Sequence, residues 1–162
     1  DPRLVEFDFV VAGSNLYRGR LEAIAREAGV DDRVTFAGYV DDDRLPGLYA
    51  GASVFLSLST VEAYGMTVAE SLAAGTTCVV RDTGALSGWV DHDGCVGISE
   101  PIPKTVATGI LEVCDSDPST EDLLLWDAVV DRTERVYEEF YYRIPNRRYD
   151  KRSAGYGRLV AA

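Results

Sequence analysis

The sequence has little positive charge. Its 162 residues include 16 Lys and Arg against 27 Asp and Glu, a formal net charge of −11, and lysine occurs only at Lys104 and Lys151. Binding to a phosphate backbone needs a basic face, so the composition argues against nucleic acid as a partner. Acids also cluster in turns such as Asp41–Asp43. This acidic, halophilic pattern predicts a salt-rich cytoplasm, since the screening length falls to ~3 Å at molar salt. An ordinary acidic protein is the alternative.

Long apolar runs and cysteines are also scarce. No apolar run approaches the ~20 residues that a transmembrane helix needs. The first residues lack the basic-then-apolar layout of a secretory signal, so we expect a cytoplasmic protein. Three widely spaced cysteines, Cys78, Cys95 and Cys114, fit neither a disulfide framework nor a zinc site. They are predicted to be reduced thiols in the core.

Short apolar runs alternate with helix-like stretches over the first 100 residues. We expect strands at 7–12, 33–37, 53–57, 77–81 and 95–99. We expect helices between them, at 16–28, 43–50, 67–74 and 86–90. Strands that alternate with helices need crossover connections, which make neighbouring strands parallel. The predicted fold class is α/β, with a doubly wound, Rossmann-like, mostly parallel sheet.

Beyond residue 100 the strand pattern stops. Helices are expected at 106–114, 121–142 and 147–160, so we predict one domain over 1–162, with a sheet core at 1–100 and a helical tail at 101–162. Arginines in the tail resemble a helix surface that balances the acidic body. Peripheral contact with a membrane surface is the less favoured interpretation, because the aromatic and basic residues there follow no regular pattern.

The loop after the third expected strand is the best candidate site. Ligands of doubly wound sheets bind outside the carboxyl ends of the strands, where loops lead into helix N-termini. Gly65 in this loop lets the backbone come close to a ligand. The amides of Met66 and Thr67 are expected to point out of the helix start toward an anion, and a diphosphate suits that position.

Two acids flank this helix start, Glu62 and Glu70. Taken alone, Thr67 and Glu70 form a capping-box pattern, in which Glu70 bonds back to the helix start. Glu62 taken alone is equally well a solvated loop acid. Their combination at the expected ligand edge favours function, because a carboxylate binds vicinal sugar hydroxyls well.

These segments resemble a known family. The E-x7-E stretch of residues 62–70 and the following 73–80 look like the signature of family 4 (group 1) retaining glycosyltransferases. Four further segments agree in order, and together the resemblance covers about residues 4 to 100. These segments are 10–13, 33–40, 45–50 and 82–84.

The resemblance implies the C-terminal half of a GT-B fold, which holds a nucleotide sugar and needs neither a cofactor nor a metal. Glu70 matches the acid that binds the nucleotide ribose, and Glu62 matches the acid at the reaction centre, the candidate catalytic residue. Gly65, Met66 and Thr67 match the loop that contacts sugar and phosphate. Val40 matches a position that meets the base. The implied donor is UDP- or GDP-linked, and the acceptor is a glycan or a lipid-linked molecule.

The sequence departs from the family at several positions. Ala63 stands for the usual glycine after the first Glu, and Gly88 stands where a Glu is common. The family's first strand and its Gly-Arg…Lys diphosphate clamp have no counterpart here. We therefore expect a fragment that lacks the first strand and the N-terminal acceptor domain, and that is not catalytic alone.

Two other functions stay open. One is a non-catalytic module, derived from this family, for nucleotide-sugar binding or assembly. The less favoured one is a GT-B sugar epimerase. A nicotinamide fold is disfavoured because the stretch Gly13–Gly19 does not give G-x-G-x-x-G. His92 is interpreted as a turn residue, since no partner cluster is apparent around it.

Overall fold

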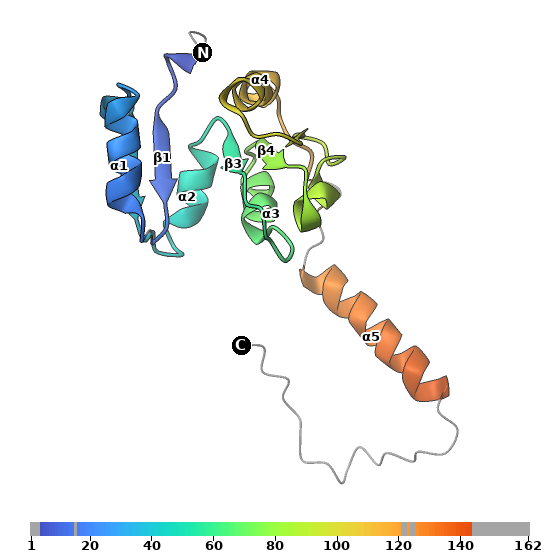
Figure 1. Ribbon diagram of the computed structural model, residues 1–162. Helices are drawn as coiled ribbons and strands as arrows, with labels where there is room; N and C mark the ends of the chain where they lie inside the picture. Colours follow the sequence, from blue (N-terminus) through green and yellow to red (C-terminus); the bar gives the residue numbers. More distant parts are fainter. Residues whose placement is uncertain (1–3, 15, 121–122, 124–125, 144–162) are drawn as a thin grey trace. The chain divides into compact units, whose positions relative to one another are not determined.

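The computed structural model describes residues 4–14, 16–120, 123 and 126–143, which form two compact units, 1–123 and 124–162. The second unit contains one described helix, α5 (Trp126–Arg143), and each unit is described by itself (Figure 1). In chain order the first unit contains β1 (Phe9–Ala12), α1 (Arg18–Glu27), the 3₁₀ turn η2 (Asp31–Arg33), β2 (Val34–Gly38), α2 (Leu45–Ala50), β3 (Phe55–Ser57), α3 (Met66–Ala73), β4 (Cys78–Arg81), the 3₁₀ helix η3 (Gly84–Trp89), β5 (Cys95–Ile98) and α4 (Pro103–Val113).

Every strand pair among the described residues is parallel, as predicted. The pairs fall into two separate ladders: β1 pairs with β2, and β4 lies between β3 and β5. The sequence predicted one sheet, but β1 and β3 are not hydrogen-bonded neighbours. The alternation of strands and helices, which requires crossovers, predicted the parallel direction correctly. It carries no information on which strands become neighbours.

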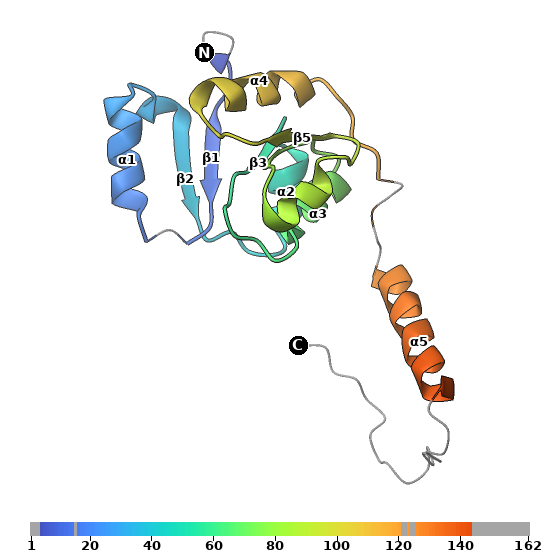
Figure 2. The same cartoon turned by 45° about the vertical axis from the view of Figure 1, so that its right-hand side comes forward.

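Strand β4 forms the centre of the hydrophobic core. Its residues alternate between two clusters, because successive side chains of a strand point to opposite faces. Cys78 and Val80 pack with residues of α3 and η3, whereas Val79 packs with residues of β5 and α4. Figure 1 shows α3 and α4 on opposite sides of β4, and Figure 2 shows α4 running alongside β5.

The β1–β2 ladder is much less covered. Phe9 and Val10 of β1 are 40% and 51% exposed, whereas Val79 and Val80 of β4 are fully buried. Strands of parallel sheets are normally buried on both faces. In this unit the core therefore lies around β4, and β1 presents apolar side chains to solvent.

The boundaries of several elements differ from the prediction. The expected helix at 86–90 is the 3₁₀ helix η3, which begins earlier, at Gly84, and contains glycines that disfavour an α-helix. Helix α4 begins at Pro103, where proline is tolerated because the first helical N–H has no partner. The helix expected at 147–160 lies outside the described residues. Among the described helices, none is long and apolar enough to cross a membrane.

The difference between the two ladders predicts a difference between two matched substitutions. Val80→Ala removes two fully buried methyl groups and should lower the free energy of unfolding by about 2–3 kcal/mol. Val10→Ala should change it by about 0.5 kcal/mol or less, because Val10 is half exposed. Urea unfolding followed by circular dichroism measures both. Equal losses would contradict the assignment of the core to β4.

Candidate active site at the start of helix α3

Helix α3 begins directly after a glycine in a left-handed conformation. Gly65, the N-cap, has φ of 93°, and its carbonyl accepts the amides of Val68 at 2.9 Å and Ala69 at 3.1 Å. Met66 and Thr67 are the first two helical residues, whose N–H groups have no carbonyl partner within an α-helix. Both residues are exposed. The geometry is the one predicted for an anion-binding helix start, and the ligand itself stays a prediction.

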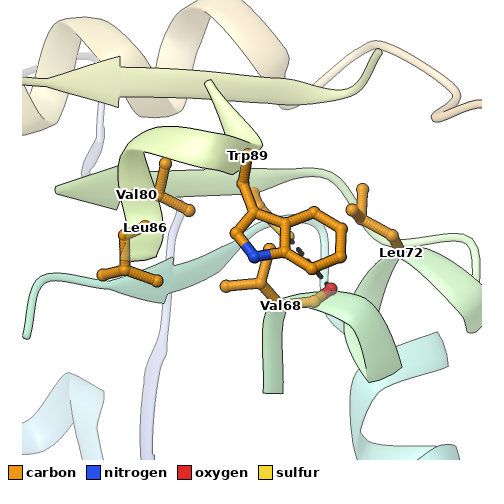
Figure 3. Packing of buried hydrophobic residues seen from close by; sticks show 6 residues of the cluster. Val68, Leu72, Val80, Leu86 and Trp89 are labelled. Atoms are coloured by element: carbon orange, nitrogen blue, oxygen red, sulfur yellow. Dashed lines mark hydrogen bonds between the residues drawn. The ribbon is translucent and has the colours of Figure 1, made fainter. Parts of the chain in front are cut away.

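Trp89 of η3 holds the loop in front of α3. Its indole Nε1 donates a hydrogen bond of 2.7 Å to the carbonyl of Tyr64, and the two rings meet edge to face at 5.4 Å. A Cβ on Gly65 would lie 2.9 Å from Nε1 of Trp89 and 3.1 Å from Cδ2 of Leu86. Figure 3 shows Trp89 among Val68, Leu72, Val80 and Leu86.

This contact gives the glycine a structural reason. Gly65 is buried, and its missing side chain leaves room for the indole of Trp89. The expected close approach of a ligand to Gly65 stays a prediction. Sequence reasoning missed Trp89, because nothing in the pattern of residues 84–90 connects it with a loop 25 residues earlier.

Glu62 lies in the loop before α3 and is half-buried. Its Oε1 accepts a hydrogen bond of 3.1 Å from the amide of Ala63. This local bond leaves the second carboxylate oxygen to other donors. Ala63 replaces a glycine of the family pattern. Because its backbone amide makes this hydrogen bond, the methyl group of Ala63 does not affect the bond.

Glu70 does not form the capping box that its spacing from Thr67 suggested. The N-cap of α3 is Gly65, two residues before the expected cap, and the helix start has no side-chain cap. Thr67 is therefore already helical, and Glu70 lies beyond the first turn. The left-handed glycine lets the helix begin earlier than the Thr–Glu pattern predicted.

The partner of Glu70 is Tyr49 of α2. The Tyr49 hydroxyl donates a hydrogen bond of 3.1 Å to Oε2 of Glu70. Tyr49 is 7% exposed, whereas Glu70 is exposed. Burial raises the pKa of Tyr49 to about 12, and the negative charge of Glu70 adds to the shift. Sequence reasoning placed Tyr49 in a family-like segment but gave it no role.

Val40 follows strand β2 and does not belong to the loop before α3. It is half-buried in the segment after β2, next to Tyr39 at the carboxyl ends of β1 and β2. An open hollow of about 240 Å³ is found at these strand ends. Its walls are formed by Val11, Gly13, Ser14, Arg18, Phe36, Gly38 and Tyr39. The predicted base contact of Val40 is therefore next to a depression, but Val40 itself does not line it.

Two further polar residues, His92 and Arg18, make local contacts. His92 lies in a turn, as predicted: its Nδ1 is 2.8 Å from the carbonyl of Asp93, and its ring contacts Trp89. Arg18 pairs with Glu22 at 2.7 Å. The three cysteines are free, and only Cys78 is fully buried. Within the described part of the chain no group of three or more His, Cys, Asp or Glu could hold a metal ion.

The model of the family Glycosyl transferases group 1 matches residues 2–123. The chain therefore belongs to the group 1 glycosyltransferases. It is 30% identical over 142 residues to an uncharacterised glycosyltransferase of Methanocaldococcus jannaschii, a match that covers 80% of this chain and 36% of the relative. The chain thus corresponds to about a third of that protein's length.

Solved structures agree with the predicted fold class. Sucrose-phosphate synthase from Thermosynechococcus elongatus superimposes with a TM-score of 0.71 at 22% identity, over 82% of this chain and 38% of that one. The Anabaena protein HepE, in complex with UDP-glucose, gives 0.67 at 19% identity, over 83% of this chain and 41% of that one. The Rossmann-like α/β fold, as part of a larger GT-B fold, is confirmed.

The contact between Gly65 and Trp89 predicts a strong effect of Gly65→Ala. A left-handed alanine costs about 1–2 kcal/mol, and overlap with the indole should add about 1–3 kcal/mol. The matched control is Gly75→Ala at the other end of α3, where φ is +85° and a Cβ meets nothing within 4 Å. Chemical unfolding of both variants measures the difference. Equal losses would show that the indole does not restrict residue 65.

Proposed function

We propose that this chain is the donor-binding part of a retaining glycosyltransferase that transfers a hexosyl group from a UDP- or GDP-linked sugar to a glycan or lipid-linked acceptor. The observation that carries the proposal is the exposed start of α3, with Glu62 just before it and Glu70 one turn into it. The chain belongs to a glycosyltransferase family, and the related fold of HepE has been solved with UDP-glucose.

The diphosphate of the donor would bind at the first amides of α3. The N–H groups of Met66 and Thr67 and the positive end of the helix dipole attract an anion locally. The same dipoles stabilise the negative charge that develops on the leaving diphosphate. In this arrangement Glu70 accepts hydrogen bonds from the ribose hydroxyls, and Glu62 faces the transferred sugar. This chemistry requires no metal or cofactor.

We infer that a further strand, from polypeptide preceding residue 1, lies between β1 and β3. Both strands have an unpaired edge next to the break between the two ladders, and Phe9 and Val10 are exposed on β1. In a doubly wound sheet of order 3-2-1-4-5-6, a central strand joins two such halves. The family's basic clamp would follow that strand, and the acceptor domain would precede it. We therefore expect the chain alone to bind a donor without transferring sugar.

A non-catalytic module is the second candidate. The observation that favours it is Gly88 in η3, where the family commonly has an acid. The two functions differ in a protein extended to include the preceding domain. A transferase releases UDP or GDP from a nucleotide sugar in the presence of an acceptor, whereas a module binds the nucleotide sugar and leaves it intact. An epimerase would instead convert the sugar.

The donor-site proposal predicts measurable binding to this chain. Titration calorimetry in molar KCl, chosen because we propose a salt-rich cytoplasm, should detect weak binding of UDP or GDP and their sugars. Glu70→Gln should weaken it about tenfold or more, because hydrogen bonds to a charged group are the stronger ones. Glu112→Gln, an exposed acid of α4, is the control.

Stability distinguishes the two interpretations of Glu70. Glu70→Gln should change the free energy of unfolding by less than about 1 kcal/mol, since the side chain is exposed. An absence of heat for every nucleotide, with the fold verified by circular dichroism, would contradict the donor site. A large loss of stability with unchanged binding would make Glu70 a structural residue.

A further inference from the structure

Glu70 is an exposed side chain with one fixed oxygen. A free glutamate side chain samples several rotamers, and ordering it when a ligand binds reduces the affinity. Here Oε2 is already bonded to the Tyr49 hydroxyl at 3.1 Å. This bond restrains the orientation of the carboxylate before any ligand arrives.

The hydroxyl itself is positioned by the core and not by Glu70. The ring of Tyr49 meets Phe55 of β3 edge to face at 5.5 Å and 88°. The backbone carbonyl of Tyr49 accepts a hydrogen bond of 2.6 Å from Oγ1 of Thr76, which is buried. Strand β3 therefore positions the side chain of Tyr49, and the turn after α3 positions its backbone.

The direction of the hydrogen bond also matters. A tyrosine hydroxyl has one proton, and the raised pKa, about 12, keeps that proton on Tyr49 at neutral pH. The proton goes to Oε2, so Oε1 and the remaining lone pairs of the carboxylate stay available as acceptors. Two vicinal hydroxyls of a ribose need acceptors of this kind.

We propose that Tyr49 is a positioning residue of the donor site, whose hydroxyl orients the Glu70 carboxylate for the ribose diol of the nucleotide. This inference rests on the proposed function. Tyr49 touches no substrate in this arrangement and acts only through Glu70. Its contribution should therefore depend on the ribose hydroxyls and should disappear when either they or the Glu70 carboxylate are absent.

The test compares ribonucleotides with 2′,3′-dideoxyribonucleotides, which lack both hydroxyls of the diol. Calorimetry with UDP, GDP and their 2′,3′-dideoxy forms is carried out on the wild-type chain, Tyr49→Phe, Glu70→Gln and the double variant. Tyr49→Phe should weaken ribonucleotide binding about three- to tenfold and leave binding of the dideoxynucleotide within about twofold of wild type. The double variant should bind like Glu70→Gln alone, since coupled residues are not additive.

A second variant keeps the inference testable if Tyr49→Phe does not fold. Phe55→Leu removes the edge-to-face contact that positions the Tyr49 ring and leaves Glu70 itself unchanged. It should weaken binding of ribonucleotides and leave binding of the dideoxynucleotides within about twofold of wild type.

The outcomes separate the inference from the function on which it rests. If the wild-type chain binds no nucleotide, the proposed function fails. If it binds, and Tyr49→Phe binds equally well, the inference is overturned. A loss of equal size for ribo- and dideoxynucleotides would also overturn it, because a merely structural tyrosine would affect both. If Tyr49→Phe does not fold, binding of ribonucleotides to Phe55→Leu at the wild-type level would likewise overturn the inference.

Discussion

The packing of helix α3 on strand β4 is the contact on which the candidate site depends. Val68 and Leu72 of the helix and Val80 of the strand have no exposed surface, so the helix cannot shift without opening the core. This contact fixes the position of the helix start and of the acids on either side of it. The site is therefore organised by apolar contacts on the buried side of α3, whereas its polar groups face solvent.

Two aromatic residues at the edge of the core restrain groups of the candidate site at the surface. Trp89 restrains the loop before α3 through the carbonyl of Tyr64, and Tyr49 restrains the carboxylate of Glu70. Both are less than a tenth exposed and come from elements other than α3. A short helix start with exposed side chains would otherwise be free to rearrange. Two side chains from neighbouring elements thus contribute to the rigidity of the candidate site.

The sequence predicted the elements of the first unit well and their contacts poorly. Apolar runs ended by glycines marked the strands and helices, and Gly65 and Gly75 do flank α3. No local pattern predicts contacts between residues that are distant in the sequence. Tyr49 lies 21 residues before Glu70, and their hydrogen bond depends on how α2 packs on α3. The capping pattern failed because a left-handed glycine competes with it locally. The division of the strands into two ladders was not predicted either, because local sequence patterns do not show which strands become hydrogen-bonded neighbours.

The uncovered strand β1 has a consequence for the behaviour of many copies of this chain. Unpaired backbone groups and the apolar side chains of Phe9 and Val10 offer a template on which a strand of another copy can add. The net charge of −11 opposes such an encounter, because like-charged molecules repel each other over the screening length. Salt weakens that repulsion and leaves the apolar attraction intact. A chain without the further strand beside β1 is therefore expected to self-associate more readily at high salt than at low salt.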